Sequence, residues 1–396
     1  MAKSRNHNGM NHPISLPALQ LLSLVRSSLW QKPTDVALFS KDDVDWQKIA
    51  QLALQQTVGI LTFEAALSMP KDLRPPKEWI NKALVFMEGN RRTHILVDRC
   101  AAEAVGKFKE EGIEGILLKG QAYARAYPQS YMRQCGDIDL YVGECNYLPA
   151  YEAVKSFEWR REKIFSLDAK HYGCWLNGVR IELHRIAGQL STKSANRKFQ
   201  QWSSNQLSIS ESNIPIAGKD ISVPTPLFDI VFVFLHMYHH FLNGGIGLRH
   251  ICDWTMLLHA HSKEIDVCQL EQKLKDYHLI KAWSLFTPIA VDHLGLKESE
   301  CPFYSPDNKK KSDRILAYIL REGNFGRALV KSSQRPDGYL AGKAYSFFHH
   351  TRRLMPKLWI DPNTLSRTYV SYVIKGLSRV IKDIKLKISN LKIVAF

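Results

Sequence analysis

Residues 136–142 (GDIDLYV) place two carboxylates one residue apart in an apolar run that alternates like a β-strand. Alternate side chains of a strand share a face, so Asp137 and Asp139 would project together. Ile138 and Leu140 would then supply apolar packing on the opposite face. Two like charges held together away from water repel each other, and a divalent cation compensates them. The run therefore predicts a strand with an oxygen-ligand site of the kind that suits Mg²⁺ or Mn²⁺.

A second motif lies upstream of the acidic run. Residues 115–120 (GILLKG) are typical of a short buried strand that ends in a glycine turn, and residues 121–127 are typical of a helix. The start of a helix presents unpaired N–H groups and the positive end of the helix dipole, which favour an anion. Glycine at the turn allows close approach, and lysine or arginine nearby adds positive charge. We therefore predict that phosphate is bound by Lys119, Gly120, Gln121 and Arg133.

A third motif lies downstream. Asn177-Gly178 is typical of a hairpin turn, and residues 179–184 (VRIELH) alternate as a strand. Glu182 is then a candidate third carboxylate. His184 shares its face and could orient a ligand, contact the acceptor or be a plain surface histidine. Arg185 could assist binding of an anionic acceptor.

The series LLKG, YP, R, GDIDLYV and IELH resembles the nucleotidyltransferase superfamily to which DNA polymerase beta belongs. It resembles more closely a family of bacterial nucleotidyltransferase-like proteins, most strongly over residues 113–185. The resemblance implies that Asp137 and Asp139 are catalytic metal ligands. It also implies that Glu182 is the third carboxylate, at the metal and near the attacking hydroxyl, and that Lys119 and Gly120 hold the triphosphate.

The function implied by this resemblance is transfer of a nucleoside monophosphate from a nucleoside triphosphate to a hydroxyl. The acceptor could be an RNA end, a protein or a small molecule. Gln121 stands where the superfamily usually has serine or glycine, which leaves open a catalytically inactive module that binds anions. A third interpretation is a metal phosphohydrolase that uses His236, His240 and Asp253.

His236 and His240 stand four residues apart, so they would share one face of a helix. Such a pair can bind a transition metal, but it can also pack, cap or contact substrate. Arg249 and Asp253 have the same spacing and could pair with each other. By analogy with related families, we expect His236, His240, Arg249 and Asp253 to face the nucleotide cleft from the helical side, and His184 could also face the substrate.

The predicted fold class is α+β, with a small mixed-sheet nucleotidyltransferase core flanked by helical blocks. The expected regions are a flexible tail at 1–14, an N-terminal helical block at 15–112, an α/β core at 113–224, a helical domain at 225–310 and a basic helical region at 311–396. Apolar periodicity predicts helices at 16–30, 45–69, 79–111, 147–157 and 227–242. We expect an irregular polar stretch from 185 to 204 and short strands at 206–210 and 221–223.

Charge and cysteine usage limit the partners and the compartment. The 396 residues carry a formal net charge of +16 with a sequence pI near 9.4, which attracts anionic partners. Seven scattered cysteines without a Cys-x-x-Cys pair fit reduced thiols in the cytoplasm. We expect neither a signal peptide nor a transmembrane segment. Residues 367–392 form a basic amphipathic pattern that could contact nucleic acid or an anionic inner membrane surface, or pack on the domain.

Overall fold

The computed structural model describes most of the chain. The described residues are 14–40, 44–157, 159–162, 164–190, 192–208, 212–324, 336–362, 365–366, 369–370, 372–374, 376–378 and 381. Of the predicted tail, residues 1–13 lie outside this set, whereas Ile14 is described and buried. Most of the basic stretch 367–392 also lies outside it.

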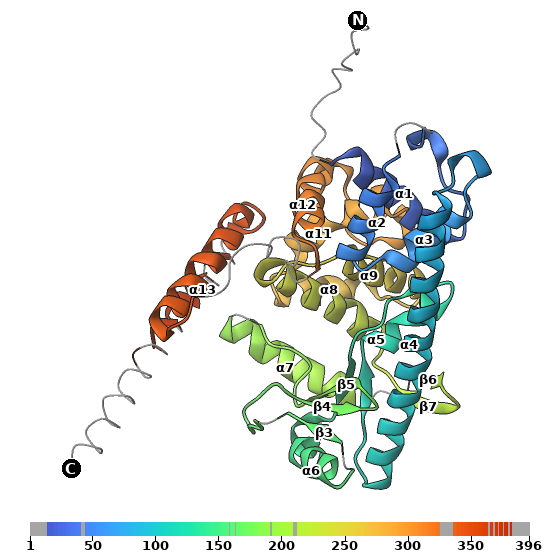
Figure 1. The fold of residues 1–396 in the computed structure, drawn as a ribbon. Coiled ribbons are helices and arrows are strands. Elements are labelled where there is room, and N and C mark those ends of the chain that lie inside the picture. Colours follow the sequence, from blue (N-terminus) through green and yellow to red (C-terminus); the bar gives the residue numbers. More distant parts are fainter. Residues whose placement is uncertain are drawn as a thin grey trace, which may run out of the picture.

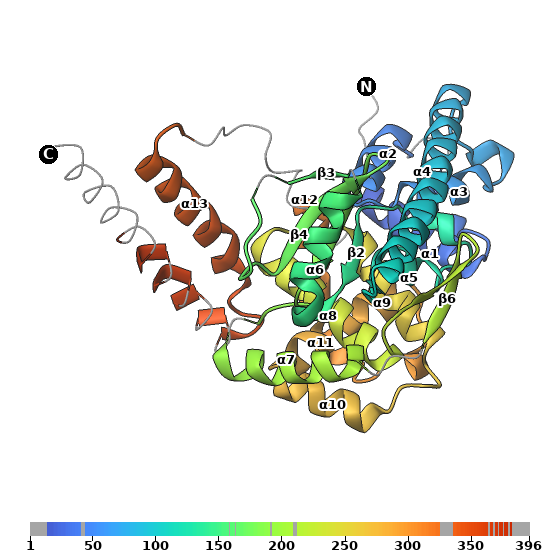
Figure 2. The same ribbon diagram turned by 90° about the horizontal axis from the view of Figure 1, so that it is seen from below.

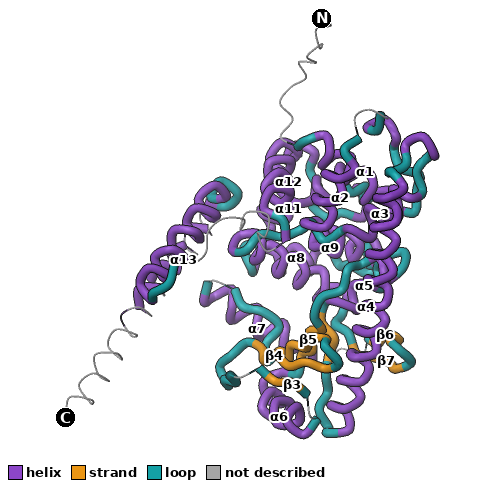
Figure 3. Tube along the Cα trace, in the orientation of Figure 1, coloured by secondary structure: helices purple, strands orange, loops and turns teal. Residues whose placement is uncertain are grey.

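A five-stranded mixed sheet forms the centre of the α/β region. Its strands, in spatial order, are β1 (Ile116–Leu118), β2 (Ile138–Tyr141), β5 (Val179–His184), β4 (His171–Leu176) and β3 (Arg160–Arg161). The pair β2–β5 is parallel, and the other three pairs are antiparallel. The strands occupy a small part of the molecule, with helices around them (Figure 3). The predicted α+β class with a small mixed sheet is confirmed.

One face of the sheet is apolar and covered by two helices. Ile138, Leu140 and Ile181 pack with buried residues of α4 (Lys77–Glu110) and α6 (Gly143–Ser156) in one hydrophobic core. The opposite face carries Asp139 and Glu182, which are paired directly across β2 and β5. On that side lie α8 (Pro226–Asn243) and α9 (Leu248–Ala260), whereas α6 lies on the other (Figure 1). The alternation of side chains along β2 thus directs its acidic side chain toward helices α8 and α9.

The N-terminal helices and the helices that follow the sheet in the sequence share one core. It joins buried residues of α1 (Leu16–Trp30) and α3 (Gly59–Leu67) to those of α8 and α9. Trp30 Nε1 donates to the carbonyl of Leu294 at 2.5 Å, and Gln56 Nε2 donates to the carbonyl of Leu320 at 3.1 Å. The remaining helices of this body are α2 (Trp46–Gln55), α10 (Val267–Asp276), α11 (Ile280–Pro288) and α12 (Lys309–Glu322), and α13 (Tyr339–Leu354) follows them.

Two parts of the predicted element map are wrong. The single helix expected at 45–69 is broken between α2 and α3, where Thr57 adopts a left-handed φ of 54°. The stretch expected to be irregular contains α7 (Lys193–Ser208), which replaces the strand expected at 206–210. Its polar composition hides a four-residue spacing of buried side chains, which are Ala195, Phe199, Ser203 and Leu207. The hairpin after it consists of β6 (Asn213–Ile216) and β7 (Lys219–Ser222).

Helix α7 packs against helices α8 and α10. It lies alongside α10 (Figure 2), and Lys198 Nζ is 2.6 Å from Asp276 Oδ1. The Trp202 ring stacks on Phe228 of α8 with a centroid distance of 5.4 Å. These long-range contacts supply the stability that local propensity does not. No helix within the described part of the chain combines the length and the apolar character needed to cross a membrane.

The central strand supplies a test of this packing. Ile181 is fully buried in β5, and Ile181→Ala should lower the free energy of unfolding by about 2 to 5 kcal/mol, because it removes apolar burial and leaves a cavity. Urea denaturation followed by circular dichroism measures the change. Ile164→Ala is the control, since Ile164 is 84% exposed. Equal stability of the two variants would contradict the assignment of Ile181 to the core.

Candidate functional site

A cavity of about 430 Å³ lies between the acidic face of the sheet and helices α8 and α9. Every residue predicted for the site except Gln121 and Arg185 lines it: Lys119, Gly120, Arg133, Asp137, Asp139, Glu182, His184, His236, His240, Arg249 and Asp253. These residues come from segments more than a hundred positions apart. Helical packing against the sheet therefore brings the predicted groups to one place.

Asp139 is the most buried carboxylate of the cavity. Its side chain is 4% exposed, whereas that of Asp137, just before β2, is 44% exposed. Lys119 Nζ lies 2.9 Å from Asp139 Oδ1, and His184 Nε2 lies 2.8 Å from the same oxygen. Burial opposes ionisation of Asp139, but Lys119 and His184 outweigh it and hold the pKa of this carboxyl below its usual range. Asp139 is thus a buried anion held by Lys119 and His184.

Arg180 connects the other two carboxylates. Its guanidinium forms an ion pair with Glu182 and lies 3.7 Å from Asp137 Oδ2. The burial of Glu182 favours its neutral form, but the hydrogen bond from His184 and the charge of nearby groups lower its pKa to about 2. Desolvation, with repulsion from Asp139 and Glu182, raises the pKa of Asp137. The repulsion that Asp137 feels is the kind that a divalent cation would relieve.

Two residues of this cluster were missed in the sequence, although the signal for both was present. Arg180 stands two positions before Glu182 and so shares its face of β5. His171 of β4 is the register partner of His184, because the two-residue turn at Asn177-Gly178 fixes the hairpin pairing. Extending the alternation across the hairpin would have found both.

The phosphate turn is built differently from the prediction. Lys119 has a φ of 50° and Gly120 a φ of 46°, after which α5 (Gly120–Ala124) is only five residues long. So short a helix has little dipole to offer an anion. A Cβ on Gly120 would lie 3.4 Å from the carbonyl oxygen of Asp137, so glycine permits close approach of the turn to the acidic segment. Positive charge at this turn comes from the Lys119 side chain.

The side chain of Gln121 lies outside the cavity, contrary to its predicted contact with phosphate. It is 2% exposed, and its amide nitrogen donates to Asp98 and lies 3.3 Å from His94 Nε2. Its carbonyl oxygen accepts from Cys135 Sγ at 3.2 Å. The residue after the glycine therefore anchors α5 to α4.

Arg133 and Asp253 form a buried pair in the cavity wall. Arg133 Nε is 2.8 Å from Asp253 Oδ1, and Nη2 is 2.9 Å from Oδ2. Tyr127 Oη also donates to Asp253, at 2.7 Å. Arg249 instead donates to the carbonyl of Gln134 at 3.0 Å. The structure therefore pairs Asp253 with Arg133 and not with Arg249, the partner that the spacing allowed. The Arg133 guanidinium, which was expected to bind phosphate, is engaged by Asp253.

Histidines of α8 and α9 form the opposite wall. His236 Nε2 and His240 Nε2 are 3.2 Å apart, and Lys119 Nζ is 3.4 Å from His236 Nε2. Burial, together with repulsion from Lys119, lowers the pKa of His236, and burial with repulsion from His239 lowers that of His240 to about 4. This wall is neutral at pH 7. Because Asp253 is engaged by Arg133, the His236, His240 and Asp253 metal set of the phosphohydrolase interpretation is not supported.

Within the described residues, the group with metal-ligand proximity is His171, Glu182 and His184, whose ligand atoms lie within 4.8 Å of one another. Two imidazoles with a carboxylate suit Mn²⁺ or another transition metal better than Mg²⁺. Asp139 lies beside His184, and the repulsion at Asp137 is only partly compensated by nearby cations. The donor set therefore fits a divalent cation. Glu182 belongs both to the set of three carboxylates and to the set that contains the two histidines.

Comparison with known proteins agrees with this geometry. A protein-family model described as an uncharacterised nucleotidyltransferase matches residues 42–295, more than half of the chain. The chain belongs to this nucleotidyltransferase family. The match confirms the resemblance carried by the LKG, GDIDLYV and IELH segments and includes both walls of the cavity. No curated protein matches the sequence.

A solved structure is also similar to this member of the nucleotidyltransferase family. It is the crystal structure of an antigenic nucleotidyltransferase-like protein from Paracoccidioides brasiliensis, with 14% sequence identity and a TM-score of 0.31. The similarity covers 52% of this chain and 92% of that chain. The family assignment rests on the sequence match.

The Arg133–Asp253 pair should contribute strongly to stability. Asp253→Ala should lower the free energy of unfolding by about 3 to 5 kcal/mol, because it leaves a buried guanidinium uncompensated. The double variant Arg133→Met/Asp253→Leu should recover most of the loss, since it removes both charges. Urea denaturation of the two variants and the parent measures this. A double variant no more stable than Asp253→Ala would contradict the charge argument.

The histidine wall predicts acid sensitivity. The pKa of His240 is about 6.5 in the unfolded chain and about 4 in the folded protein. At pH values between these two, the unfolded chain therefore binds more protons at His240 than the folded protein does. Stability from this residue is present above the unfolded pKa and lost as pH falls. His184, whose pKa is raised by Asp139 and Glu182, acts in the opposite direction.

We expect His240 alone to account for roughly 2 kcal/mol of lost unfolding free energy between pH 7 and pH 5. His240→Gln should flatten the pH profile by this amount. Urea denaturation at several pH values tests this. Identical slopes for His240→Gln and the parent would contradict a neutral His240.

Proposed function

We propose that this protein transfers a nucleoside monophosphate from a nucleoside triphosphate to a hydroxyl acceptor. The observation that carries the proposal is the register of β2 and β5, which sets Asp139 beside Glu182 with Asp137 just before β2. All three carboxylates line the same cavity as Lys119. A module that only binds anions has no need of three carboxylates in one cavity.

Five residues of the cavity have a proposed part in the reaction. Asp137, Asp139 and Glu182 would hold Mg²⁺ or Mn²⁺, which neutralises charge on the triphosphate when bound. Lys119, now 2.9 Å from Asp139, would turn to a phosphate oxygen. His184 would keep the carboxylates oriented through its hydrogen bond to Asp139.

The acceptor hydroxyl would lose its proton to Glu182 or to water as its oxygen attacks the α-phosphate. Pyrophosphate leaves from the opposite side. For this reaction, the metal ion would replace Lys119 at Asp139 and Arg180 at Glu182. The basic residues of 367–392 remain candidates for contact with nucleic acid or an anionic membrane.

Asp139→Asn should reduce transfer by about a hundredfold or more, because the amide is a poor ligand for a hard cation. The assay incubates purified protein with each α-labelled nucleoside triphosphate, a cell extract as acceptor source, and Mg²⁺ or Mn²⁺. Asp168→Asn is the control, since Asp168 is an exposed aspartate outside the cavity. Absence of both labelling and a nucleotide-induced thermal shift, with either metal, would favour an inactive module.

A further inference from the structure

A second pocket adjoins the carboxylate cavity. It has a volume of about 640 Å³ and lies between the ends of β2 and β5, the start of α6, and α7. Ala187 and Gln189 line both spaces, so the two pockets are direct neighbours. Tyr141, in the wall of the second pocket, lies two residues beyond Asp139 on the same strand face, a backbone distance of about 7 Å. The second pocket therefore lies within one or two residue lengths of the carboxylates.

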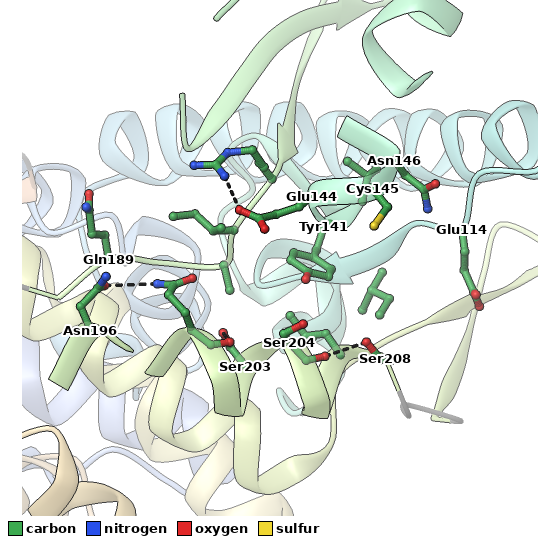
Figure 4. Close-up of a pocket in the computed structure, with 18 residues that line it drawn as sticks. Glu114, Tyr141, Glu144, Cys145, Asn146, Gln189, Asn196, Ser203, Ser204 and Ser208 are labelled. Carbon is green, nitrogen blue, oxygen red and sulfur yellow. Dashed lines mark hydrogen bonds and ion pairs between the residues drawn. The ribbon is translucent and has the colours of Figure 1, made fainter. Parts of the chain in front are cut away.

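Amide and hydroxyl groups dominate the polar lining of this pocket. Figure 4 shows Tyr141 on one side and Ser203 and Ser204 on the other, with Gln189 and Asn196 toward one end and Asn146 toward the other. Each amide and hydroxyl both donates and accepts, as each hydroxyl of a sugar does. Tyr141 adds an aromatic ring. This combination matches a hydroxyl-rich ligand.

The charge of the second pocket differs from that of the first. Among the described residues that line it, the basic side chain is that of Arg185, which forms an ion pair with Glu144. Glu114 also lines it, so the pocket offers little to a phosphate. The carboxylate cavity instead contains Lys119, Lys170 and Arg180, which suit the triphosphate. The lysines and the arginine of the carboxylate cavity thus favour the anionic substrate, whereas the second pocket favours an uncharged ligand over an anion.

Part of the lining is available to a ligand. Gln200 Nε2 donates to the carbonyl of Gly188 at 2.7 Å, and Asn196 Oδ1 accepts from the backbone N–H of Leu190 at 2.9 Å. Within the described part of the chain, the amides of Asn146 and Gln189 make no such hydrogen bond. Gln189 is exposed and belongs to both spaces, so it stands where an acceptor would pass from one to the other.

We propose that this pocket binds the acceptor and that the acceptor is a neutral, polyhydroxylated molecule of the carbohydrate class. The inference rests on the proposed nucleotidyl transfer. In the reaction, a sugar hydroxyl gives its proton to Glu182 or water, and its oxygen forms a bond to the α-phosphorus. The bond from that phosphorus to the bridging oxygen breaks, and the electron pair leaves with pyrophosphate. The pocket opens at exposed Gln189 and Ser204, so a larger glycan could extend into solvent.

The binding step is tested without nucleotide or metal. Saturation-transfer NMR on the full chain with maltose, lactose, sucrose and trehalose should detect binding of at least one sugar. Ser204→Trp, which fills the pocket from α7, should weaken it about tenfold or more, and Gln189→Ala should weaken it less. Asn205→Trp is the matched control, because Asn205 is an exposed neighbour on α7 outside the lining. Absence of sugar binding, or equal binding by both tryptophan variants, would overturn the proposal.

Measurements with nucleotide distinguish failure of the carbohydrate proposal from failure of the proposed nucleotidyl transfer. Ser204→Trp should leave the thermal shift by triphosphate and Mn²⁺ unchanged. Loss of that shift in Ser204→Trp alone would assign the pocket to the nucleoside and overturn the acceptor assignment. If labelled triphosphate modifies RNA or a peptide in both tryptophan variants, nucleotidyl transfer stands and the carbohydrate acceptor falls. Sugar binding without any response to nucleotide would support the pocket while contradicting the proposed function.

Discussion

The parallel pairing of β2 with β5 is the constraint on which the rest of the site depends. It sets Asp139 directly beside Glu182 on one face while Ile138 and Ile181 enter the core on the other. Two carboxylates so close require compensation, and the protein supplies it through Lys119, Arg180 and His184. A shift of one residue in either strand would exchange charged and apolar faces, so the hydrophobic core fixes the geometry of the carboxylates.

The compensating side chains can be exchanged for a metal ion and a polyphosphate. Lys119 and Arg180 are long, flexible cations that can leave a carboxylate when a divalent ion and a polyphosphate arrive together. Lys119 stands 2.9 Å from Asp139 and 3.4 Å from His236, between the sheet and the helical wall. Its position lets one side chain stabilise the carboxylate before binding and the phosphate after it. Arg133 has no such freedom, because two of its nitrogens donate to the two carboxylate oxygens of Asp253.

Much of the fold and the candidate site could be predicted from the sequence. The alternation of residues 136–142 and 179–184 predicted two strands with acidic faces, and the predicted helix at 16–30 has the bounds of α1. The predictions failed at α7, whose few buried residues are separated by polar ones, and at Gln121, whose direction depends on Asp98 of another helix. In both places the deciding contacts come from distant parts of the chain.

The sequence by itself indicated the candidate groups of the site: three carboxylates on or next to two strands, a lysine-glycine turn before the acidic strand, and membership of a nucleotidyltransferase family. Periodicity encodes which side chains share a face, because that relation is local. Only the tertiary structure decided that Asp253 binds Arg133, that Arg180 lies between Asp137 and Glu182, and that α7 closes a neutral pocket beside the charged one. These pairings depend on how separate elements pack, and burial selects among partners that local spacing leaves equivalent.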